Sequence, residues 1–294
     1  LGAQYATSSS LRSAIRPKVE WQAALTEDEA KRTAELANRI GDAARAAGLQ
    51  YAYHNHDYEF TVLGDGTSAY DLLLRDTDWH LDRLYDFAEG LGVSILQAVQ
   101  SRYVVDLNRP ADDQSLYPGQ ATTGLCSTID FDGRPLYRPG EEPDAAEIVR
   151  RVETVWKPYH AALAAELERI KAQHGYALLY DAHSIRSVVP RLFDGVLPDL
   201  NLGSNGGATA APVLKERIAE ICRTAEGFSH VVDGRFRGGI ITRHYGQPQQ
   251  KVHALQMELA QRHYMDEDPP FTYQAERAQP LKAVLRRVLE AMLE

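Results

Sequence analysis

The sequence predicts an α/β fold of three layers, with a mostly parallel β-sheet flanked by helices. Short apolar runs that end in polar groups alternate with stretches of helical periodicity, as strands and crossover helices do. The clearest run, residues 176–179, is followed by Asp181, His183 and Ser184. Buried strands deliver polar groups in this way to the carboxyl edge of a sheet, where open α/β folds place their sites. With 294 residues, 44% of them hydrophobic, the chain can bury a sizeable core.

Charge and composition argue against several classes of function. A net charge of −9 and an isoelectric point near 5.6 leave no basic surface to offset phosphate repulsion, so we expect no nucleic-acid partner. No apolar stretch reaches the length of a membrane span, so we expect no membrane partner. Cys126 and Cys222 give neither a disulfide framework nor paired metal-ligand spacing. We therefore predict a cytoplasmic protein; the sequence leaves its oligomeric state open.

The amino-terminal part predicts a loop over residues 1–25, then a helix and a strand. The helix begins at the capping-box pattern TEDE and ends at Gly48. The strand, residues 49–53, ends in His54 and His56. Because these histidines alternate along the strand direction, they share a face and could bind a divalent metal. Taken alone, a polar loop at a strand end is the simpler interpretation.

The rest of the chain predicts alternating helices and strands. Helices are indicated by apolar residues three and four apart, and strands by short apolar runs between Gly, Pro or polar residues. Pro158 is expected to kink the longest helix, and Gly175 to end it. The helices are expected at residues 78–87, 143–174, 212–225 and 280–294, the strands at 93–99, 102–110, 176–184, 228–232, 239–242 and 252–259, and the long polar loops at 111–142 and 198–211.

Several predicted strands end in unlike polar side chains. In a parallel sheet such ends meet at one edge, so a histidine, a glutamate and several arginines could share a cleft. This set suits metal-assisted hydrolysis of an anionic substrate, in which a metal activates water, a glutamate moves the proton and an arginine binds a carboxylate. Each residue alone is more simply a structural or solvated group. The residues concerned are Asn108, Arg109, Asp181, His183, Arg243, His244 and Glu258.

A series of longer motifs follows in order along residues 77–294. They are DTDWHLDRLYDFA, SRYVVDLNRP, LYPGQATTGLC, GYALLYDAHSIRSVVPRLF, LPDLNLGSNGGA, GRFRGGIITRHYGQP and VHALQMELAQRHYMDE. With these motifs the region resembles the N-formylglutamate amidohydrolase family. The resemblance implies a fold similar to that of zinc-dependent carboxypeptidases and aspartoacylases.

The same resemblance implies an activity and a set of residue roles. The activity is hydrolysis of N-formyl-L-glutamate to glutamate and formate, a step of histidine breakdown, so the substrate would be a small acidic N-acyl amino acid. A divalent metal, with zinc as the expected ion, would take part, although such ligands also suit manganese or cobalt. The implied roles are metal ligation by His183 and Asp78, polarisation of the scissile carbonyl by Arg102, proton transfer by Glu258, and carboxylate binding by Asn108, Arg109 and Arg243.

Residues 20–76 resemble a different family. The strings AGLQYAYHNHDYEF and AYDLLL are similar to the sugar phosphate isomerase/epimerase family, which has a xylose-isomerase-like TIM barrel. They stand where the amidohydrolase family carries a P-H-[AS]-G motif, whose histidine is expected to bind the metal. The chain therefore looks chimeric, with an isomerase-like fragment at residues 1–76 and an amidohydrolase-like domain at 77–294. By spacing, His54 or His56 would replace the missing ligand, and His54 is taken as the third ligand.

Three functions are compatible with these patterns. The first is a metal-dependent deformylase, impaired if the amino-terminal ligand is not replaced. The second is a sugar phosphate isomerase, which rests on a short segment without the rest of a barrel. The third is an inactive remnant that still binds a dicarboxylate through Arg102, Arg109 and Arg243.

Overall fold

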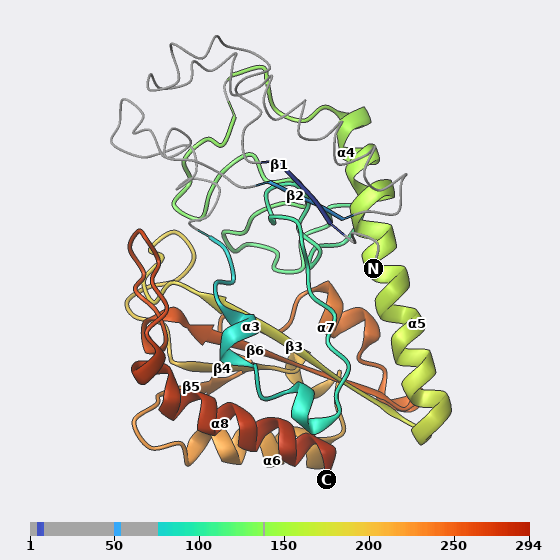
Figure 1. The fold of residues 1–294 in the computed structure, drawn as a ribbon, viewed down its shortest axis with the longest axis vertical. Helices are drawn as coiled ribbons and strands as arrows, with labels where there is room; N and C mark the ends of the chain where they lie inside the picture. Colours follow the sequence, from blue (N-terminus) through green and yellow to red (C-terminus); the bar gives the residue numbers. More distant parts are fainter. Residues whose placement is uncertain (1–4, 9–49, 54–75, 138) are drawn as a thin grey trace. The chain divides into compact units, whose positions relative to one another are not determined.

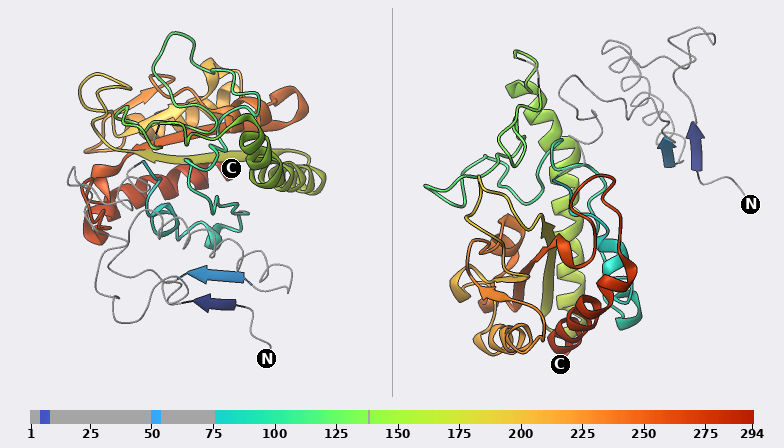
Figure 2. Two further views of the ribbon diagram at one scale, coloured as in Figure 1. Left: turned by 90° about the horizontal axis from the view of Figure 1, so that it is seen from above. Right: turned by 90° about the vertical axis from the view of Figure 1, so that its left-hand side faces the viewer.

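The computed structural model describes residues 5–8, 50–53, 76–137 and 139–294. Contacts between Cα atoms divide the chain into two units, Leu1–Arg75 and Asp76–Glu294, and each is described by itself. In the first unit, β1 (Tyr5–Ser8) pairs in parallel with β2 (Gln50–Tyr53), as Figure 2 shows. β2 confirms the predicted strand, whereas β1 lies where a loop was expected. The predicted helix before β2, and His54 and His56 after it, lie outside the described residues.

The second unit contains a mixed four-stranded sheet (Figure 1). Its order is β3-β6-β4-β5, in which β3 and β6 are parallel, β6 and β4 antiparallel, and β4 and β5 parallel. The expected mostly parallel sheet is therefore corrected to a mixed one. The strands are β3 (Ala177–Ile185), β4 (Leu200–Gly203), β5 (His230–Val232) and β6 (Val252–Ala260).

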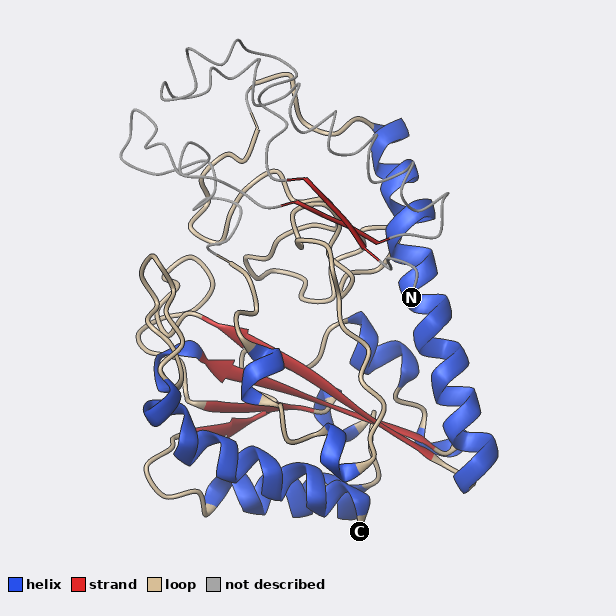
Figure 3. Cartoon of the chain, viewed as in Figure 1, coloured by secondary structure: helices blue, strands red, loops and turns tan. Residues whose placement is uncertain are grey.

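Helices flank this sheet (Figure 3). α5 (Lys157–His174) packs on β3, and α7 (Ile240–Tyr245) packs on β3 and β6. Leu163, Leu167, Ala177, Ile241 and Val252 form the buried apolar cluster between these elements. α5 ends where predicted, at Gly175, whose φ of 82° lets its amide donate to the Lys171 carbonyl.

The other helices lie around these elements. α6 (Pro212–Arg223) and α8 (Ala275–Leu293) lie side by side and cover apolar residues of the core (Figure 1). No helix among the described residues is both long and apolar enough to cross a membrane. The shorter elements are α3 (Leu81–Leu84), α4 (Ala145–Arg151), a π-turn η5 (Val152–Trp156), and the 3₁₀ turns η4 (Glu89–Leu91), η6 (Asn205–Gly207), η7 (Pro248–Gln250) and η8 (Gln261–His263).

Four predicted elements are wrong in type. Residues 93–99 and 102–110 form turns and irregular chain instead of strands. Residues 239–242 begin helix α7, because the Asn108 carbonyl accepts from the Ile240 amide and its side-chain oxygen accepts from the Ile241 amide. Asn108 thus satisfies the first amides of the helix from far away in sequence. The second polar loop contains strand β4. The π-turn η5 ends two residues before Pro158, which lies in the first turn of α5, where a proline is tolerated.

Candidate active site

The candidate active site begins on one face of β3. Odd-numbered residues of the strand share this face, which changes from apolar at Ala177 and Leu179 to polar at Asp181 and His183. The parallel register places Gln256 and Glu258 of β6 beside Asp181 and His183. The apolar half of the face packs on α5 and α7, while the polar half holds the titratable groups.

His183 lies at the centre of these groups. Its Nδ1 is 3.0 Å from Asp78 Oδ2, and its Nε2 is 2.9 Å from Asp181 Oδ1. Asn108 Nδ2 lies 2.8 Å from the same Nε2. Burial opposes protonation of the imidazole, but the carboxylates of Asp181 and Asp78 outweigh it and raise the pKa of His183 well above its usual value.

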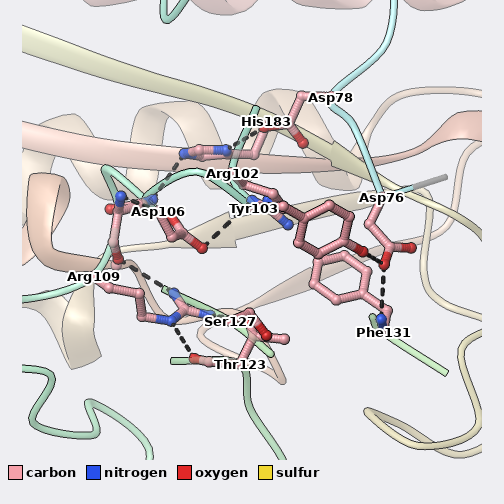
Figure 4. A network of polar contacts seen from close by, with 12 residues as sticks. Asp76, Asp78, Arg102, Tyr103, Asp106, Arg109, Thr123, Ser127, Phe131 and His183 are labelled. Atoms are coloured by element: carbon pink, nitrogen blue, oxygen red, sulfur yellow. Dashed lines mark hydrogen bonds and ion pairs between the residues drawn. The ribbon is translucent and has the colours of Figure 1, made fainter. Parts of the chain in front are cut away.

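Asp78 connects the start of the second unit to the end of β3 (Figure 4). One of its carboxylate oxygens faces His183, and the other accepts a hydrogen bond from the Ser184 amide at 3.1 Å. Burial favours the neutral acid, yet His183 and Arg102 lower the pKa of Asp78. The carboxylate is therefore charged and held in place by the backbone of β3.

Asp76 fixes the chain on the amino-terminal side of Asp78. Its buried carboxylate accepts hydrogen bonds from the Tyr103 hydroxyl and, at 2.7 Å, from the Phe131 amide (Figure 4). Arg186 lies 3.5 Å from its other oxygen. Three segments far apart in sequence therefore meet at Asp76 and position Asp78.

Asn108 and Arg109 lie in a turn that faces the same groups. Asn108 contacts His183 through Nδ2 and accepts from the Ile241 amide through Oδ1 at 3.0 Å. Arg109 donates to the Thr123 and Asn108 carbonyls, at 2.9 Å and 3.2 Å. Among the described residues no carboxylate lies within 4.0 Å of its guanidinium, although its charge lowers the pKa of the buried Asp106.

Arg102 and Glu258 supply opposite charges to the site. Burial opposes the charge on Arg102, but Asp106, Asp78 and Glu258 raise its pKa, so it stays positive. Burial raises the pKa of Glu258 to about 7, opposed by the positive charges of His183 and Arg102. A buried carboxyl with such a pKa exchanges protons readily near neutral pH, as a general acid or base must.

Most of the predicted site residues line one cavity. Arg102, Asn108, Arg109, His183 and Glu258 contribute to its wall, and Asp78 lies beside it against His183. Arg243 does not line it: its guanidinium donates to the Gly238 and Leu116 carbonyls at 2.8 Å and 2.9 Å. The other lining residues are Tyr117, Thr122, Thr123, Phe131, Ile185, Leu192, Arg235, Phe236, Gly239 and Gln256.

Gln256 and Arg235 are two of the lining residues that the sequence-based prediction missed. Gln256 accepts from the Gly239 amide at 2.9 Å and donates to Glu258 Oε2 at 3.1 Å, so it orients the carboxyl. Alternation along β6 would have found it, because it lies two residues before Glu258 on the same face. Arg235 lies in an irregular segment after β5, where no periodicity exists to reveal its direction.

The donor groups fit a divalent cation only in part. The Asp78 carboxylate and the His183 imidazole are ligand types that zinc, manganese and cobalt accept. Asp181 at the opposite nitrogen of His183 is the kind of partner that orients a metal-binding imidazole. The described residues contain no cluster of three His, Cys, Asp or Glu side chains able to hold a metal ion. The predicted third ligand, His54, lies outside the described residues.

The site combines a histidine between two carboxylates, a buried glutamate and several arginines at one cavity. These features are typical of an enzyme that hydrolyses an anionic substrate. The sequence matches the family described as N-formylglutamate amidohydrolase over residues 53–265, and the chain belongs to this family of enzymes. It is 61% identical to the N-formylglutamate deformylase of Pseudomonas aeruginosa (strain PAO1) over 220 residues, which are 75% of this chain and 82% of that protein.

Two further comparisons agree with this assignment. The N-formylglutamate deformylase of Pseudomonas putida is 55% identical over 220 residues, with 75% of this chain and 82% of that protein covered. The crystal structure of N-formylglutamate amidohydrolase from Ralstonia eutropha JMP134 is similar with a TM-score of 0.60 at 24% identity, covering 74% of this chain and 82% of that one. This structural likeness shows the shared fold. The family match begins at Tyr53 and so includes His54.

Proposed function

We propose that this protein hydrolyses N-formyl-L-glutamate to L-glutamate and formate with the help of a divalent metal ion, zinc in the first instance. The observation that carries the proposal is that His183, Glu258, Asn108 and Arg109 line one cavity in a chain of this family, with Asp78 bound to His183 beside it. The relatives named above are N-formylglutamate deformylases. As part of the proposal, the protein acts in the cytoplasm in the breakdown of histidine.

Each residue of the site has a separate role in the proposed reaction. Asn108 and Arg109 bind a substrate carboxylate, which places the formyl group near His183. Arg102 faces the negative charge that develops on the formyl oxygen. Glu258 takes a proton from the attacking water and returns it to the amide nitrogen as the C–N bond breaks. A bound metal ion would polarise the carbonyl and lower the pKa of water.

The proposed metal ligands are Asp78, His183 and His54. His183 would bind through Nδ1, because this nitrogen faces Asp78 while Asp181 holds Nε2. By sequence spacing, we propose His54 as the third donor in place of the histidine of the P-H-[AS]-G motif, which this sequence lacks. Its inclusion rests on sequence spacing, and it lies outside the described residues.

An inactive dicarboxylate-binding protein is the second candidate. It is favoured by Arg109 and Arg235, which line the cavity and have no carboxylate within 4.0 Å among the described residues. It differs from the first proposal in predicting binding of glutarate without turnover.

Formate release separates the two functions. Protein loaded with zinc, manganese or cobalt is incubated with N-formyl-L-glutamate, and formate and glutamate are quantified. The proposal predicts equal amounts of the two products and loss of the reaction after chelation. Glutarate binding without formate release under any of the three metals would overturn hydrolysis and favour the inactive protein.

The third ligand is tested by elemental analysis of the purified protein. His54→Ala is expected to lower the bound zinc per chain at least tenfold at limiting zinc, because a two-ligand site holds the ion weakly. His174→Ala, at the exposed carboxyl end of α5, is the matched control and should leave the metal content unchanged. Equal stoichiometry in wild type and His54→Ala would remove His54 from the site.

A further inference from the structure

The cavity contains a third arginine that the proposed reaction does not use. Arg235 lies in the segment after β5 and lines the cavity together with Arg102 and Arg109. Its Nε donates to the Leu192 carbonyl at 2.7 Å and its Nη2 to the Ala121 carbonyl at 2.6 Å. Within the described part of the chain, the ion pairs give Arg235 no carboxylate partner. These bonds leave donors of the planar guanidinium free for a ligand.

We propose that Arg235 binds the γ-carboxylate of the substrate and so selects an acidic side chain. The inference rests on the proposed function, because it assigns the second negative charge of N-formylglutamate to a second cation of the same cavity. It replaces the earlier expectation that Arg243 makes this contact, since Arg243 donates to two backbone carbonyls and does not line the cavity.

Arg109 and Arg235 line the same cavity, so each is available to one carboxylate of the substrate. Asn108 lies 2.8 Å from His183, so the Asn108–Arg109 pair is adjacent to the reaction centre. The α-carboxylate is attached to the carbon that bears the amide nitrogen, and the γ-carboxylate is two methylenes further away. The pair next to His183 therefore suits the α-carboxylate, which leaves the γ-carboxylate for Arg235.

The surroundings of Arg235 hold its side chain in place before a ligand binds. Its guanidinium carbon lies 5.4 Å from the ring centres of both Tyr117 and Phe236. Together with the Leu192 and Ala121 carbonyls, these rings fix the planar group in one orientation. A preorganised arginine loses little side-chain entropy when a carboxylate binds.

The positive charges of Arg235 and Arg109 favour the binding of an anion in the cavity. Burial lowers the pKa of Arg235, and the positive charge of Arg109 contributes to the lowering. Two cations that repel each other in a partly buried cavity are both stabilised when a dicarboxylate enters. A substrate with one carboxylate would stabilise only one of them directly.

The test compares two substrates that differ in one group. N-formyl-L-glutamine has nearly the shape of N-formyl-L-glutamate but a neutral amide in place of the γ-carboxylate. For Arg235→Met we expect kcat/KM for N-formylglutamate to fall about 10- to 100-fold, the range for a lost charged hydrogen bond. The value for N-formylglutamine should change less than about threefold. Arg235→Lys, which keeps the charge, should retain most of the preference for the acid.

Arg237→Met is the matched control. Arg237 lies two residues further in the same segment, is exposed, and donates to the Asp233 carbonyl. The same chemical change there should leave both substrates unaffected. An equal loss on both substrates in Arg235→Met would show that Arg235 acts only on local structure and would overturn the inference.

Binding of glutarate keeps this test separate from the test of hydrolysis. Glutarate carries both carboxylates of glutamate without the amide, and butyrate carries one. Calorimetry should show that wild type binds glutarate at least tenfold more tightly than butyrate, and that Arg235→Met loses this difference. If wild type releases no formate but shows this pattern, the proposed hydrolysis fails and Arg235 keeps its role. Unchanged glutarate binding in Arg235→Met overturns that role, whatever the protein catalyses.

Discussion

The Asn108 side chain packs closely against Gly239, and this packing holds it in place for its other contacts. It contacts His183, caps the amides of α7 and precedes Arg109 in the turn. A Cβ atom at position 239 would lie 2.2 Å from Asn108 Oδ1, which is far inside van der Waals contact. The glycine is therefore required by the space that Asn108 occupies, because its own φ of −84° is open to any residue.

This fit gives a prediction at the residue scale. Gly239→Ala should push Asn108 away from His183, lower kcat/KM at least tenfold and lower the free energy of unfolding by about 1–3 kcal/mol. Steady-state formate release and urea denaturation measure the two effects. Gly90→Ala is the control, because nothing lies within 4 Å of a Cβ there, and it should change the unfolding energy by less than about 0.5 kcal/mol. An unaffected Gly239→Ala enzyme would contradict the role given to Asn108.

Individual site residues could be predicted where they follow a regular strand. His183 and Glu258 lie near the carboxyl ends of β3 and β6, and the parallel register places them side by side. Arg235 could not be found this way, since it is positioned by carbonyls of two distant loops. The functional roles of all these residues stay predictions until the variants are measured.

At the scale of elements, the π-turn η5 directs one side chain toward the site. Trp156 is the last residue of η5. The indole of Trp156 donates to the Arg109 carbonyl at 2.9 Å, and its ring stacks on that of His160 with 3.8 Å between the ring centres. His160 in turn contacts the Leu107 carbonyl at 2.9 Å. The helix therefore holds the backbone on both sides of Asn108. Such π-turns are often found at functional sites.

Trp156→Phe tests this support. The substitution keeps an aromatic ring for stacking and removes the indole donor, so the unfolding free energy should fall by about 1 kcal/mol. Because Arg109 would be held less firmly, KM for N-formylglutamate should rise about three- to tenfold with a smaller change in kcat. Val149→Ala, at an exposed position of α4, is the control and should alter neither value. A lower kcat at constant KM would mean that Trp156 acts elsewhere.

The elements themselves were predictable to different degrees. The amphipathic helices α5, α6 and α8 and the strands β3 and β6 follow from periodicity and from long apolar runs. α7 and β4 do not, because they are short and depend on distant partners. The first amides of α7 are bound by Asn108. The last residue of β4, Gly203, packs closely against the backbone of Arg237 and Gly238.

At the scale of the whole unit, the antiparallel contact between β4 and β6 could not be read from the sequence. Strand direction depends on how loops return the chain, and neither strand carries a local signal for it. Asp199, just before β4, stabilises this arrangement. Its carboxylate accepts from the amide and hydroxyl of Ser229, both at 2.7 Å, and is paired with Arg262 and His263.

The Asp199 carboxylate makes stability depend on pH. Burial raises its pKa, but the hydrogen bonds from Ser229 and the contact with His263 outweigh burial and lower it below the usual 3.8. The unfolded chain therefore binds the proton more tightly, so the stabilisation is present above about pH 4–5 and is lost as the pH falls through the folded pKa.

Asp199→Asn should reveal this contribution. At pH 7 the variant should be less stable than wild type by about 1–3 kcal/mol, and the difference should shrink as the pH falls below 4. Urea denaturation of both proteins from pH 7 to pH 3 measures it. Asp112→Asn in an exposed turn is the control, with no change beyond about 0.5 kcal/mol at pH 7. A difference that does not depend on pH would contradict the assignment.

We propose that the groups around His183 hydrolyse N-formylglutamate with Glu258 as the proton carrier. The most direct measurement is the initial rate of formate release by metal-loaded wild type and Glu258→Gln, with glutarate binding measured on the same samples. We expect formate release by wild type, a loss of about 10²- to 10⁴-fold in Glu258→Gln, and glutarate binding by the two proteins that agrees within a factor of about three. Equal rates in the two proteins, or no release by wild type, would contradict it.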